Sequence, residues 1–243
     1  MDFVKKLLPT LLIGLAVVVT GYILGTSYLS KGKDDPKISV TGLGQESFDS
    51  DLIVWRASFS RNAMDLKQAY ADLNADVVEV KKFLSSQGIQ ENEIVFYAAD
   101  ISKNYDNQYD ENGNFKERVF RGYELRQSFE IQSKSVDLVE KTSREVSKLI
   151  DAGIELNSYS PQYYYTKLAE LKIKMIEQAT KDAKNRAETI AKNGGVSLGD
   201  LVKANMGVFL FISENKSDEY SWGGSFNTSS KRKKASITMR LNY

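Results

Sequence analysis

Carboxylates, lysines, tyrosines and hydroxyls are the side chains in this chain that could do chemistry, because the sequence contains neither cysteine nor histidine. Their absence excludes thiolate nucleophiles, disulfides, cysteine- and histidine-based zinc sites and lipid attached to cysteine. It also removes the side chain that most often transfers protons near neutral pH. Catalysis by the remaining groups would need a shifted pKa or an activating partner. We therefore expect no enzyme, and we assign no catalytic, cofactor-binding or metal-binding residue.

The polar stretch 104–114, NYDNQYDENGN, carries acids and amides whose oxygens suit Ca²⁺. When Gly113 is aligned with the invariant glycine of an EF-hand loop, the first, third and fifth ligand positions fall on Gln108, Asp110 and Asn112. Val119 then stands where a bidentate glutamate is required, so the EF-hand interpretation fails. A looser oxygen-ligand site is the alternative to a solvated hairpin tip, in which Asn112 and Gly113 would form the turn.

A glycine-containing stretch at residues 41–47, TGLGQES, raises the question of phosphate binding. A dinucleotide-binding turn needs the pattern GxGxxG between a strand and a helix. Here Ser47 occupies the place of the third glycine, and the residues that follow, 52–61, alternate like a strand. Both departures argue against a nucleotide site. Gly42 and Gly44 would instead leave a bare strip on one face of a strand, where a bulge, a helix or a neighbouring chain fits.

Two further clusters could form interfaces. The basic run 231–234, KRKK, could contact anionic lipid or nucleic acid. It lacks the interleaved aromatic residues of a nucleic-acid platform and follows a polar loop, 213–230, so we expect a solvated loop end. The three tyrosines at 163–165 could form a protein interface or cover the core at the start of a helix.

The overall charge gives no reason to expect nucleic acid as a partner. The 243 residues include 33 basic and 32 acidic side chains, for a formal net charge of +1. With 42% hydrophobic and 27% charged residues, the chain has the composition of a folded globular protein. Any electrostatic effect must therefore be local.

Residues 7–29 form an apolar stretch without a charged side chain. At about 1.5 Å per residue, a helix of this length crosses a hydrocarbon core roughly 30 Å thick. A cleaved signal peptide is the alternative, but the run exceeds the usual apolar length and no clear cleavage site ends it. We therefore predict a short cytoplasmic segment at 1–6, a transmembrane anchor in lipid at 7–29, a linker at 30–36 and an extracytoplasmic domain at 37–243.

From residue 38 onward, strand-like and helix-like segments alternate. Strand patterns occupy 38–48, 52–61, 93–103, 119–131, 155–159, 201–213 and 235–243. Helix patterns occupy 65–87, 135–152 and 161–193, and the glycines that follow them are Gly88, Gly153, Gly194 and Gly195. A left-handed cap is expected at Gly88. This order predicts an α+β fold with helices packed on mainly antiparallel sheet, and a parallel doubly wound sheet is the weaker alternative.

The same periodicities predict which side chains face the core. On the second strand these are Ile53, Trp55, Ala57 and Phe59. On the first two helices they are Leu66, Ala69, Leu73, Val77, Val80 and Leu84, then Val136, Val139, Val146 and Ile150. On the longest helix they are Ile176, Ala179, Ala183, Ala187 and Ile190, and the thin alanine layer predicts close packing against a sheet or helix. Its outer face offers the i,i+4 pairs Glu177/Lys181, Asp182/Arg186 and Glu188/Lys192.

The opening strand and the end of the longest helix together resemble the SIMPL-domain family. Members share a V-x-G-x-G strand and a late helix of the pattern D-A-x-x-[RK]-A-x-x-[IL]-A-x-x-x-G followed by L-G. The matching positions are Val40, Gly42, Gly44, Asp182, Ala183, Arg186, Ala187, Ile190, Ala191, Gly195, Leu198 and Gly199. Members commonly carry a Pro-Asp pair after the opening strand, whereas this chain has Phe48-Asp49-Ser50-Asp51, so the turn there is expected to differ.

The resemblance implies an envelope or periplasmic bacterial protein without an established catalytic site. Some members are linked to oxidative-stress defence or are surface immunogens, and a relative assembles into a ring-like, channel-shaped oligomer. We therefore expect a membrane-anchored, self-associating envelope scaffold or stress-defence protein, a homo-oligomer with no nucleic-acid partner. A ligand- or metal-binding stress module and a carboxylate-based enzyme are the alternatives. The signalling role of a mammalian namesake finds no support in a chain with an N-terminal anchor.

Overall fold

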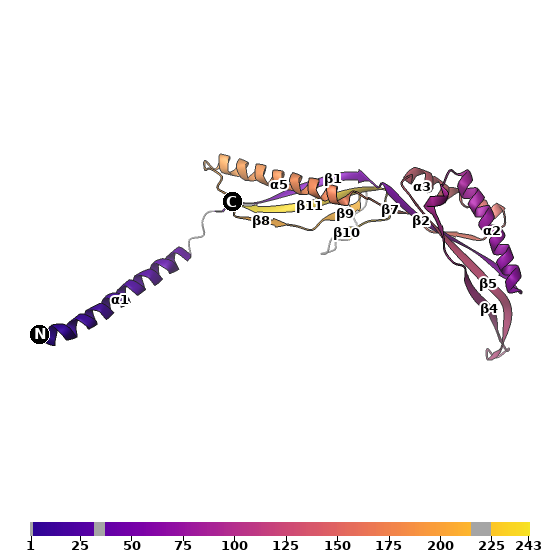
Figure 1. Cartoon of the computed structure of the whole chain (residues 1–243), viewed down its shortest axis with the longest axis horizontal. Coiled ribbons are helices and arrows are strands. Elements are labelled where there is room, and N and C mark those ends of the chain that lie inside the picture. Colours follow the sequence, from indigo (N-terminus) through magenta and orange to yellow (C-terminus); the bar gives the residue numbers. More distant parts are fainter. Residues whose placement is uncertain (1, 32–36, 215–224) are drawn as a thin grey trace.

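The protein folds into two lobes, each built from one sheet and the helices packed on it (Figure 1). The structure is a computed structural model that describes residues 2–31, 37–214 and 225–243. We call the described part of 37–49 and 168–243 the proximal lobe, and residues 52–164 the distal lobe. Their sheets are mainly antiparallel, which confirms the predicted α+β fold.

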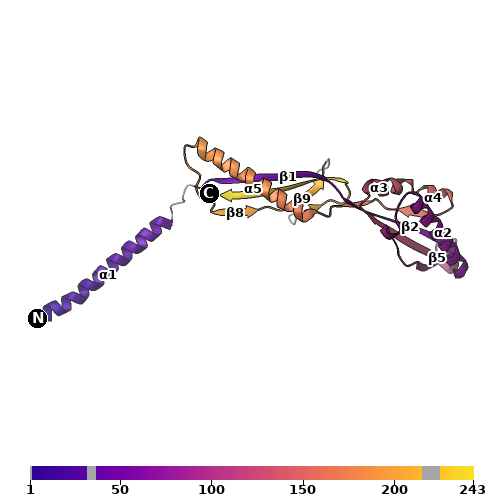
Figure 2. The same cartoon turned by 45° about the horizontal axis from the view of Figure 1, so that its top comes forward.

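The sheet of the proximal lobe is five-stranded, in the order β1-β11-β9-β10, with β8 also paired to β11. Its strands are β1 Ser39–Asp49, β8 Lys203–Met206, β9 Leu210–Ser213, β10 Ser225–Phe226 and β11 Arg232–Asn242. β1 and β11 run antiparallel along the whole length of β1. The helix α5, Leu168–Asn193, lies along β1 and β11 (Figure 2). The apolar side chains between them form the core of this lobe.

The sheet of the distal lobe is six-stranded, in the order β3-β5-β2-β6, with β4 beside β5 and β7 beside β2. Its strands are β2 Leu52–Ala63, β3 Ile94–Phe96, β4 Asp100–Tyr109, β5 Phe115–Ser133, β6 Leu156–Ser158 and β7 Gln162–Tyr164. The helices are α2 Leu66–Ser86, α3 Val136–Glu145 and α4 Lys148–Asp151, and the 3-10 turn η1 spans Glu91–Glu93. Ile53, Trp55, Ala57 and Phe59 are buried on one face of β2, as predicted.

The boundaries of α2 follow from the residues that flank it. The Asp65 carboxylate accepts a hydrogen bond from the Gln68 N–H at 3.0 Å and so caps the first turn. After the helix, Gly88 has a φ of +89°, the left-handed conformation predicted for it. The predicted core positions Ala69, Leu73, Val80 and Leu84 are buried, whereas Leu66 is exposed in the first turn.

The longest helix begins at Leu168 and not at Pro161, so the predicted start was wrong. Residues Gln162–Tyr164 form β7, which pairs with the segment of β2 from Leu52 to Val54. Tyrosine favours strands, and β2 offers these residues a partner, so long-range pairing overrides the local helical pattern. Tyr163 is buried, which places it in the core and not on an open interface.

Three other predicted elements are divided in the structure. The predicted helix 135–152 is broken between α3 and α4, and this break changes which side chains face inward, so Leu149 is buried and Ile150 is exposed. The predicted strand 93–103 is split into β3 and β4, and the predicted strand 201–213 into β8 and β9. Turns and breaks of this kind leave little trace in hydrophobic periodicity.

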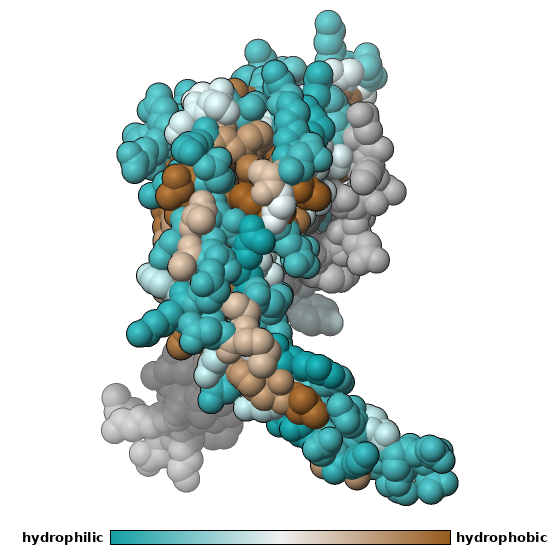
Figure 3. Space-filling view, turned by 90° about the vertical axis from the view of Figure 1, so that its right-hand side faces the viewer, coloured by the Kyte–Doolittle hydropathy of each residue, from teal (hydrophilic) through white to brown (hydrophobic). Residues whose placement is uncertain are grey.

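Beyond residue 104, β4 and β5 pair only with each other and form a two-stranded arm, residues 104–122. The predicted polar loop is therefore mostly strand, and only its end makes the turn. Edge-to-face pairs stabilise the arm, with ring centroids 5.5 Å apart for Tyr105 and Phe120 and 6.2 Å apart for Tyr109 and Phe115. Seen from the distal end, the surface is largely hydrophilic, and apolar residues form small areas and a narrow band (Figure 3).

The N-terminal helix α1 spans Asp2–Lys31 and extends away from the lobes (Figure 1). Side chains of α1 are described for residues 14–28, so the predicted cytoplasmic segment 1–6 and part of the predicted anchor 7–29 lie outside that description. The predicted linker 30–36 lies almost wholly outside the described residues. Within the described part of the chain, no helix is long and apolar enough to span a bilayer.

Candidate functional site

The two glycines of the opening strand are the points at which α5 touches β1 most closely. A Cβ atom on Gly42 would lie 2.1 Å from the carbonyl oxygen of Ala179 and 2.4 Å from the N atom of Ala183. A Cβ atom on Gly44 would lie 2.3 Å from the carbonyl oxygen of Met175. The helix backbone itself therefore occupies the space above both glycines, and the bare strip predicted for β1 is filled by α5.

The helix side of this contact is a row of buried side chains at four-residue spacing, four of which are alanines. The buried residues of α5 are Leu171, Met175, Ala179, Ala183, Ala187 and Ala191. Close packing through the alanines is therefore confirmed. The predicted stripe was wrong at Ile190, which is exposed, and at Ile176, which is only half-buried, because the contact follows a single i,i+4 row.

Polar contacts flank the glycine contact. The Asp182 carboxylate accepts hydrogen bonds from the Leu43 N–H at 2.9 Å and from Arg186 Nε at 3.0 Å. The Leu43 N–H is the larger cause, and Arg186 the second, of the lowered pKa of Asp182. One predicted i,i+4 pair, Asp182/Arg186, is thus formed and also holds the helix to the strand. We call these contacts between β1 and α5 the glycine seam.

The second candidate site is the junction between the lobes, where three stretches of chain cross. The Asp51 N–H donates to the carbonyl oxygen of Tyr164 at 3.1 Å, and the Tyr163 N–H donates to that of Thr228 at 2.8 Å. The Asp51 carboxylate accepts from the N–H and the hydroxyl of Thr166, both at 2.7 Å. Residues 48–51, where the resemblance led us to expect a Pro-Asp pair and a different turn, therefore contribute Asp51 to this network.

Lys233 occupies the centre of the junction and is 0% exposed. Its ammonium donates to Ser50 Oγ at 2.6 Å, to the carbonyl oxygen of Tyr163 at 3.1 Å and to the carbonyl oxygen of Ser230. The rings of Tyr163 and Phe226 each have their centroid 5.8 Å from Nζ. Burial lowers the pKa of Lys233 to about 8.

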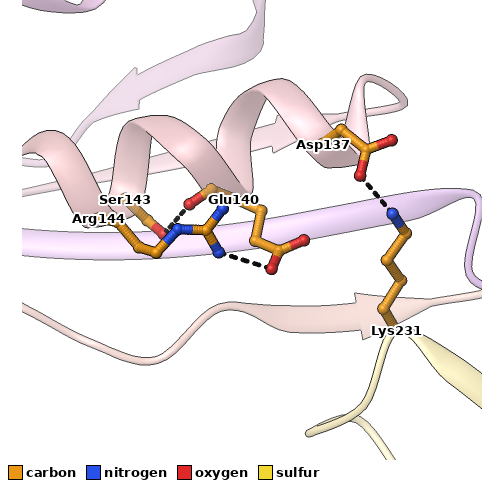
Figure 4. A network of polar contacts seen from close by, with 5 residues as sticks. All are labelled: Asp137, Glu140, Ser143, Arg144 and Lys231. Atoms are coloured by element: carbon orange, nitrogen blue, oxygen red, sulfur yellow. Dashed lines mark hydrogen bonds and ion pairs between the residues drawn. The ribbon is translucent and has the colours of Figure 1, made fainter.

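The prediction of a solvated KRKK segment was therefore wrong for Lys233. A signal for its burial was present in the sequence, since Lys233 is in phase with the inward residues Ala235, Ile237, Met239 and Leu241 of the same strand. Its neighbour Lys231 makes an exposed contact instead and donates to the Asp137 carboxylate of α3 (Figure 4). That hydrogen bond is the main cause of the raised pKa of Lys231.

A separate group of polar contacts lies further along α3. The Arg144 guanidinium donates to the Glu140 carboxylate at 2.7 Å, and the Ser143 hydroxyl donates to the Glu140 carbonyl oxygen at 2.8 Å (Figure 4). These side chains are partly or wholly exposed, so each ion pair contributes little by itself. The charged surface of α3 therefore lies next to Lys231, the residue that precedes β11.

The polar turn of the arm uses its acidic group for its own structure. The Asp110 carboxylate accepts from the Asn112 N–H at 2.9 Å and from the Asn114 N–H at 2.8 Å. Gly113 has a φ of +79°, as a turn at this place requires. Among the described residues, no group of three or more acids is placed to hold a metal ion. The arrangement favours the hairpin-tip interpretation.

Two other features bear on the alternatives. Asp76 is a buried carboxylate of α2, and its two oxygens accept from Arg61 Nε at 2.5 Å and from Arg61 Nη2 at 2.7 Å, so it is engaged in an ion pair. A shallow pocket of about 470 Å³ lies beside the glycine seam. It is lined by Val40, Thr41, Asn185, Arg186, Thr189 and Ile190.

Together these features define a two-lobed α+β domain with a close strand–helix seam and a hydrogen-bonded junction between its lobes. The family model described as SIMPL, a protein of unknown function (DUF541), matches residues 38–239, which run through both lobes. The chain therefore belongs to the SIMPL family, and the predicted resemblance is confirmed. No curated protein was found to match the chain.

Proposed function

We propose that this protein is a membrane-anchored, non-enzymatic scaffold of the bacterial cell envelope that associates with copies of itself. The observation that carries the anchor is the exposure of α1. All of the residues 14–28 are exposed, among them Val18 and Leu24, and none of them is charged. Exposing such a continuous apolar surface to water is unfavourable. A lipid bilayer can surround a helix that is apolar on every side.

The proposed topology follows from the sequence around the helix. Residues 7–29 cross the cytoplasmic membrane, and Lys5 and Lys6 favour a cytoplasmic location for residues 1–6. Residues 30–36 then link the anchor to the domain at 37–243, which lies in the periplasm or outside the cell. In this compartment nucleic acid is not a partner, in accord with the nearly balanced charge of the chain.

The open edge of β1 is the surface that we propose for self-association. β1 ends the strand order of its sheet and pairs only with β11 among the described strands. The Leu43 N–H points away from β11, toward Asp182, and the N–H groups of Thr41 and Gln45 point the same way because alternate residues of a strand share a direction. Such an edge pairs readily with a strand of another chain.

The variant Gln45→Pro tests this proposal because it removes a donor at the open edge and leaves the ladder with β11 intact. We expect light scattering of the detergent-extracted full chain to show an oligomer for the wild type and a smaller species for Gln45→Pro. The control Gln45→Ala keeps the N–H and should retain the wild-type mass. A monomeric wild type at micromolar concentration would exclude the scaffold, and an unchanged mass of Gln45→Pro would exclude this edge.

A stress-defence module that binds a ligand is the second candidate. The observation in its favour is the pocket beside the glycine seam, where Arg186 offers a positive charge next to Thr41 and Thr189. Because Arg186 already pairs with Asp182, and because the pocket is shallow, we place this function after the scaffold.

A further inference from the structure

The end of the proximal lobe from which the chain leads to α1 brings several segments together. The N–H groups of Ile38 and Tyr243 each donate to the carbonyl oxygen of the other residue at 3.0 Å. The loop 194–202 follows α5 and returns to the same place, since the Val202 N–H donates to the Asn242 carbonyl oxygen at 2.8 Å. Figure 1 shows this end, with the C-terminus and the end of α5, on the side of α1.

Large apolar side chains are exposed at this end. Ile190 is 51% exposed, Val196 59%, Leu201 50% and Val202 69%. The same loop also contains Leu198, which packs against the core of the proximal lobe. The loop therefore partly buries one of its apolar side chains and leaves three exposed. We call Ile190, Val196, Leu201 and Val202 the base. Grouped apolar exposure of this kind marks a surface that meets a partner or a membrane.

The length of chain between α1 and the lobe limits how far the base can lie from the proposed anchor. Lys31 is the last residue of α1, and Lys37 is the first described residue of the domain. At no more than about 3.6 Å per residue, six residue steps reach roughly 20 Å. A lobe tethered this closely stays within reach of the headgroup region of the membrane that holds α1.

The charges around the base suit an anionic lipid surface. Lys37, Lys192 and Lys203 are exposed, and Asp200 is an exposed acid in the same loop. Lysines beside apolar side chains are the combination found where proteins contact the interface of a bilayer, because their long stems lie along the apolar layer while the ammonium meets phosphate.

We propose that the base rests in the phospholipid headgroup region next to the anchor and so holds the two lobes in a fixed direction from the membrane. This inference rests on the proposed anchor, because the tether brings the base to lipid only if α1 is inserted. A second copy of the chain is the other covering that such a surface could have, and it gives a different result in the test below.

Site-directed spin labelling of the full chain tests this inference directly, because the chain has no cysteine of its own. Single nitroxide labels are attached to Val202→Cys and Val196→Cys in the base, to Leu24→Cys in α1 and to Val95→Cys in the distal lobe. These positions are all exposed, so the labels disturb no core packing. The protein is reconstituted into vesicles of equal parts phosphatidylethanolamine and phosphatidylglycerol. Relaxation by oxygen, which concentrates in lipid, is compared with relaxation by a water-soluble nickel chelate.

We expect the ratio of oxygen to nickel relaxation to be highest at Leu24, several-fold lower but clearly raised at Val202 and Val196, and lowest at Val95. A raised ratio at Leu24 with base values equal to that of Val95 would overturn the inference and leave the anchor intact. Base labels protected from both reagents would indicate a protein contact and would also overturn it. A low ratio at Leu24 would reject the anchor, and with it the position of the base.

Discussion

Lys233 joins the lobes through hydrogen bonds to neutral groups, and this environment sets the pKa of its ammonium. The ammonium is fully buried, and its three hydrogen bonds go to a hydroxyl and two carbonyl oxygens without a carboxylate among them. Desolvation therefore has no opposing ion pair, and the pKa falls to about 8. Near neutral pH the side chain is still protonated, so all three N–H groups of Nζ donate hydrogen bonds. These bonds connect Nζ to Ser50, Tyr163 and Ser230.

This lowered pKa predicts how stability depends on pH. Between pH 8 and pH 10.5 the native lysine is deprotonated and the unfolded one still carries its proton, so the free energy of unfolding rises with pH across that window. Relative to Lys233→Met, the wild type should gain about 3 kcal/mol from below pH 8 to above pH 10.5. Urea unfolding of both proteins at several pH values measures this difference. A difference that stays constant from pH 7 to pH 10.5 would contradict the prediction.

Single-residue features of this kind are only partly open to prediction from sequence. The alternation along β11 places Lys233 with inward residues, yet charge alone suggests a solvated position. Burial of the ammonium is possible because Ser50 and the carbonyl oxygens of Tyr163 and Ser230 converge there and accept its hydrogen bonds. Periodicity can indicate an inward lysine, but the acceptors that satisfy it depend on the tertiary fold.

At the scale of the elements, the glycine seam fixes the distance between β1 and α5. The atoms nearest to Gly42 belong to the backbone of Ala179 and Ala183, which cannot move aside as a side chain could. The hydrogen bond from the Leu43 N–H to the Asp182 carboxylate and the ion pair between Lys174 and Glu46, at 2.7 Å, also hold the helix to the strand. The glycines are therefore required by packing and not by backbone conformation.

The seam predicts a large cost for the smallest possible side chain. Gly42→Ala should lower the free energy of unfolding by about 2 kcal/mol or more, because the new methyl group forces α5 away from the sheet. Gly199→Ala is the matched control, since nothing lies within 4 Å of a Cβ atom there, and its effect should stay within about 0.5 kcal/mol. Urea denaturation followed by circular dichroism compares them. Equal stabilities of the two variants would show that α5 does not pack as described.

Elements with a long, regular hydrophobic pattern were predicted well. Elements whose boundaries depend on contacts with distant parts of the chain were not. The inward face of β2, the glycine cap at the end of α2 and the alanine row of α5 follow from local spacing and local residue types. The start of α5 depends on β2, which draws residues 162–164 into its sheet. The glycine strip was predicted as a place for a bulge, a helix or a neighbouring chain, and the structure shows that a helix, α5, fills it.

At the scale of the whole molecule, the junction makes one elongated body from two lobes. The ladder of β1 and β11 leads directly into it, because the Ser50 N–H donates to the Lys231 carbonyl oxygen at 2.9 Å where that ladder ends. The aromatic rings of Tyr164 and Phe226, with centroids 6.4 Å apart, add a contact between strands of different lobes. Such a body carries the arm away from the end at which α1 lies (Figure 1).

The arm offers a direct test of the proposed topology. A protease recognition sequence inserted between Gly113 and Asn114 lies at an exposed turn, where insertions disturb folding least. If residues 37–243 lie outside the cytoplasm, protease added to intact spheroplasts should cleave this site. An epitope tag placed before residue 1 should stay protected, because residues 1–6 would be cytoplasmic.

Permeabilised cells are the control for that experiment, because both the arm site and the tag must then be accessible. Cleavage of the arm only after permeabilisation would place the domain in the cytoplasm and contradict the envelope scaffold. Cleavage of the arm in intact spheroplasts with simultaneous loss of the tag would reject a helix that crosses the membrane once. Because the cut would fall between β4 and β5, which hydrogen bonds hold together, the fragments must be separated under denaturing conditions before they are compared.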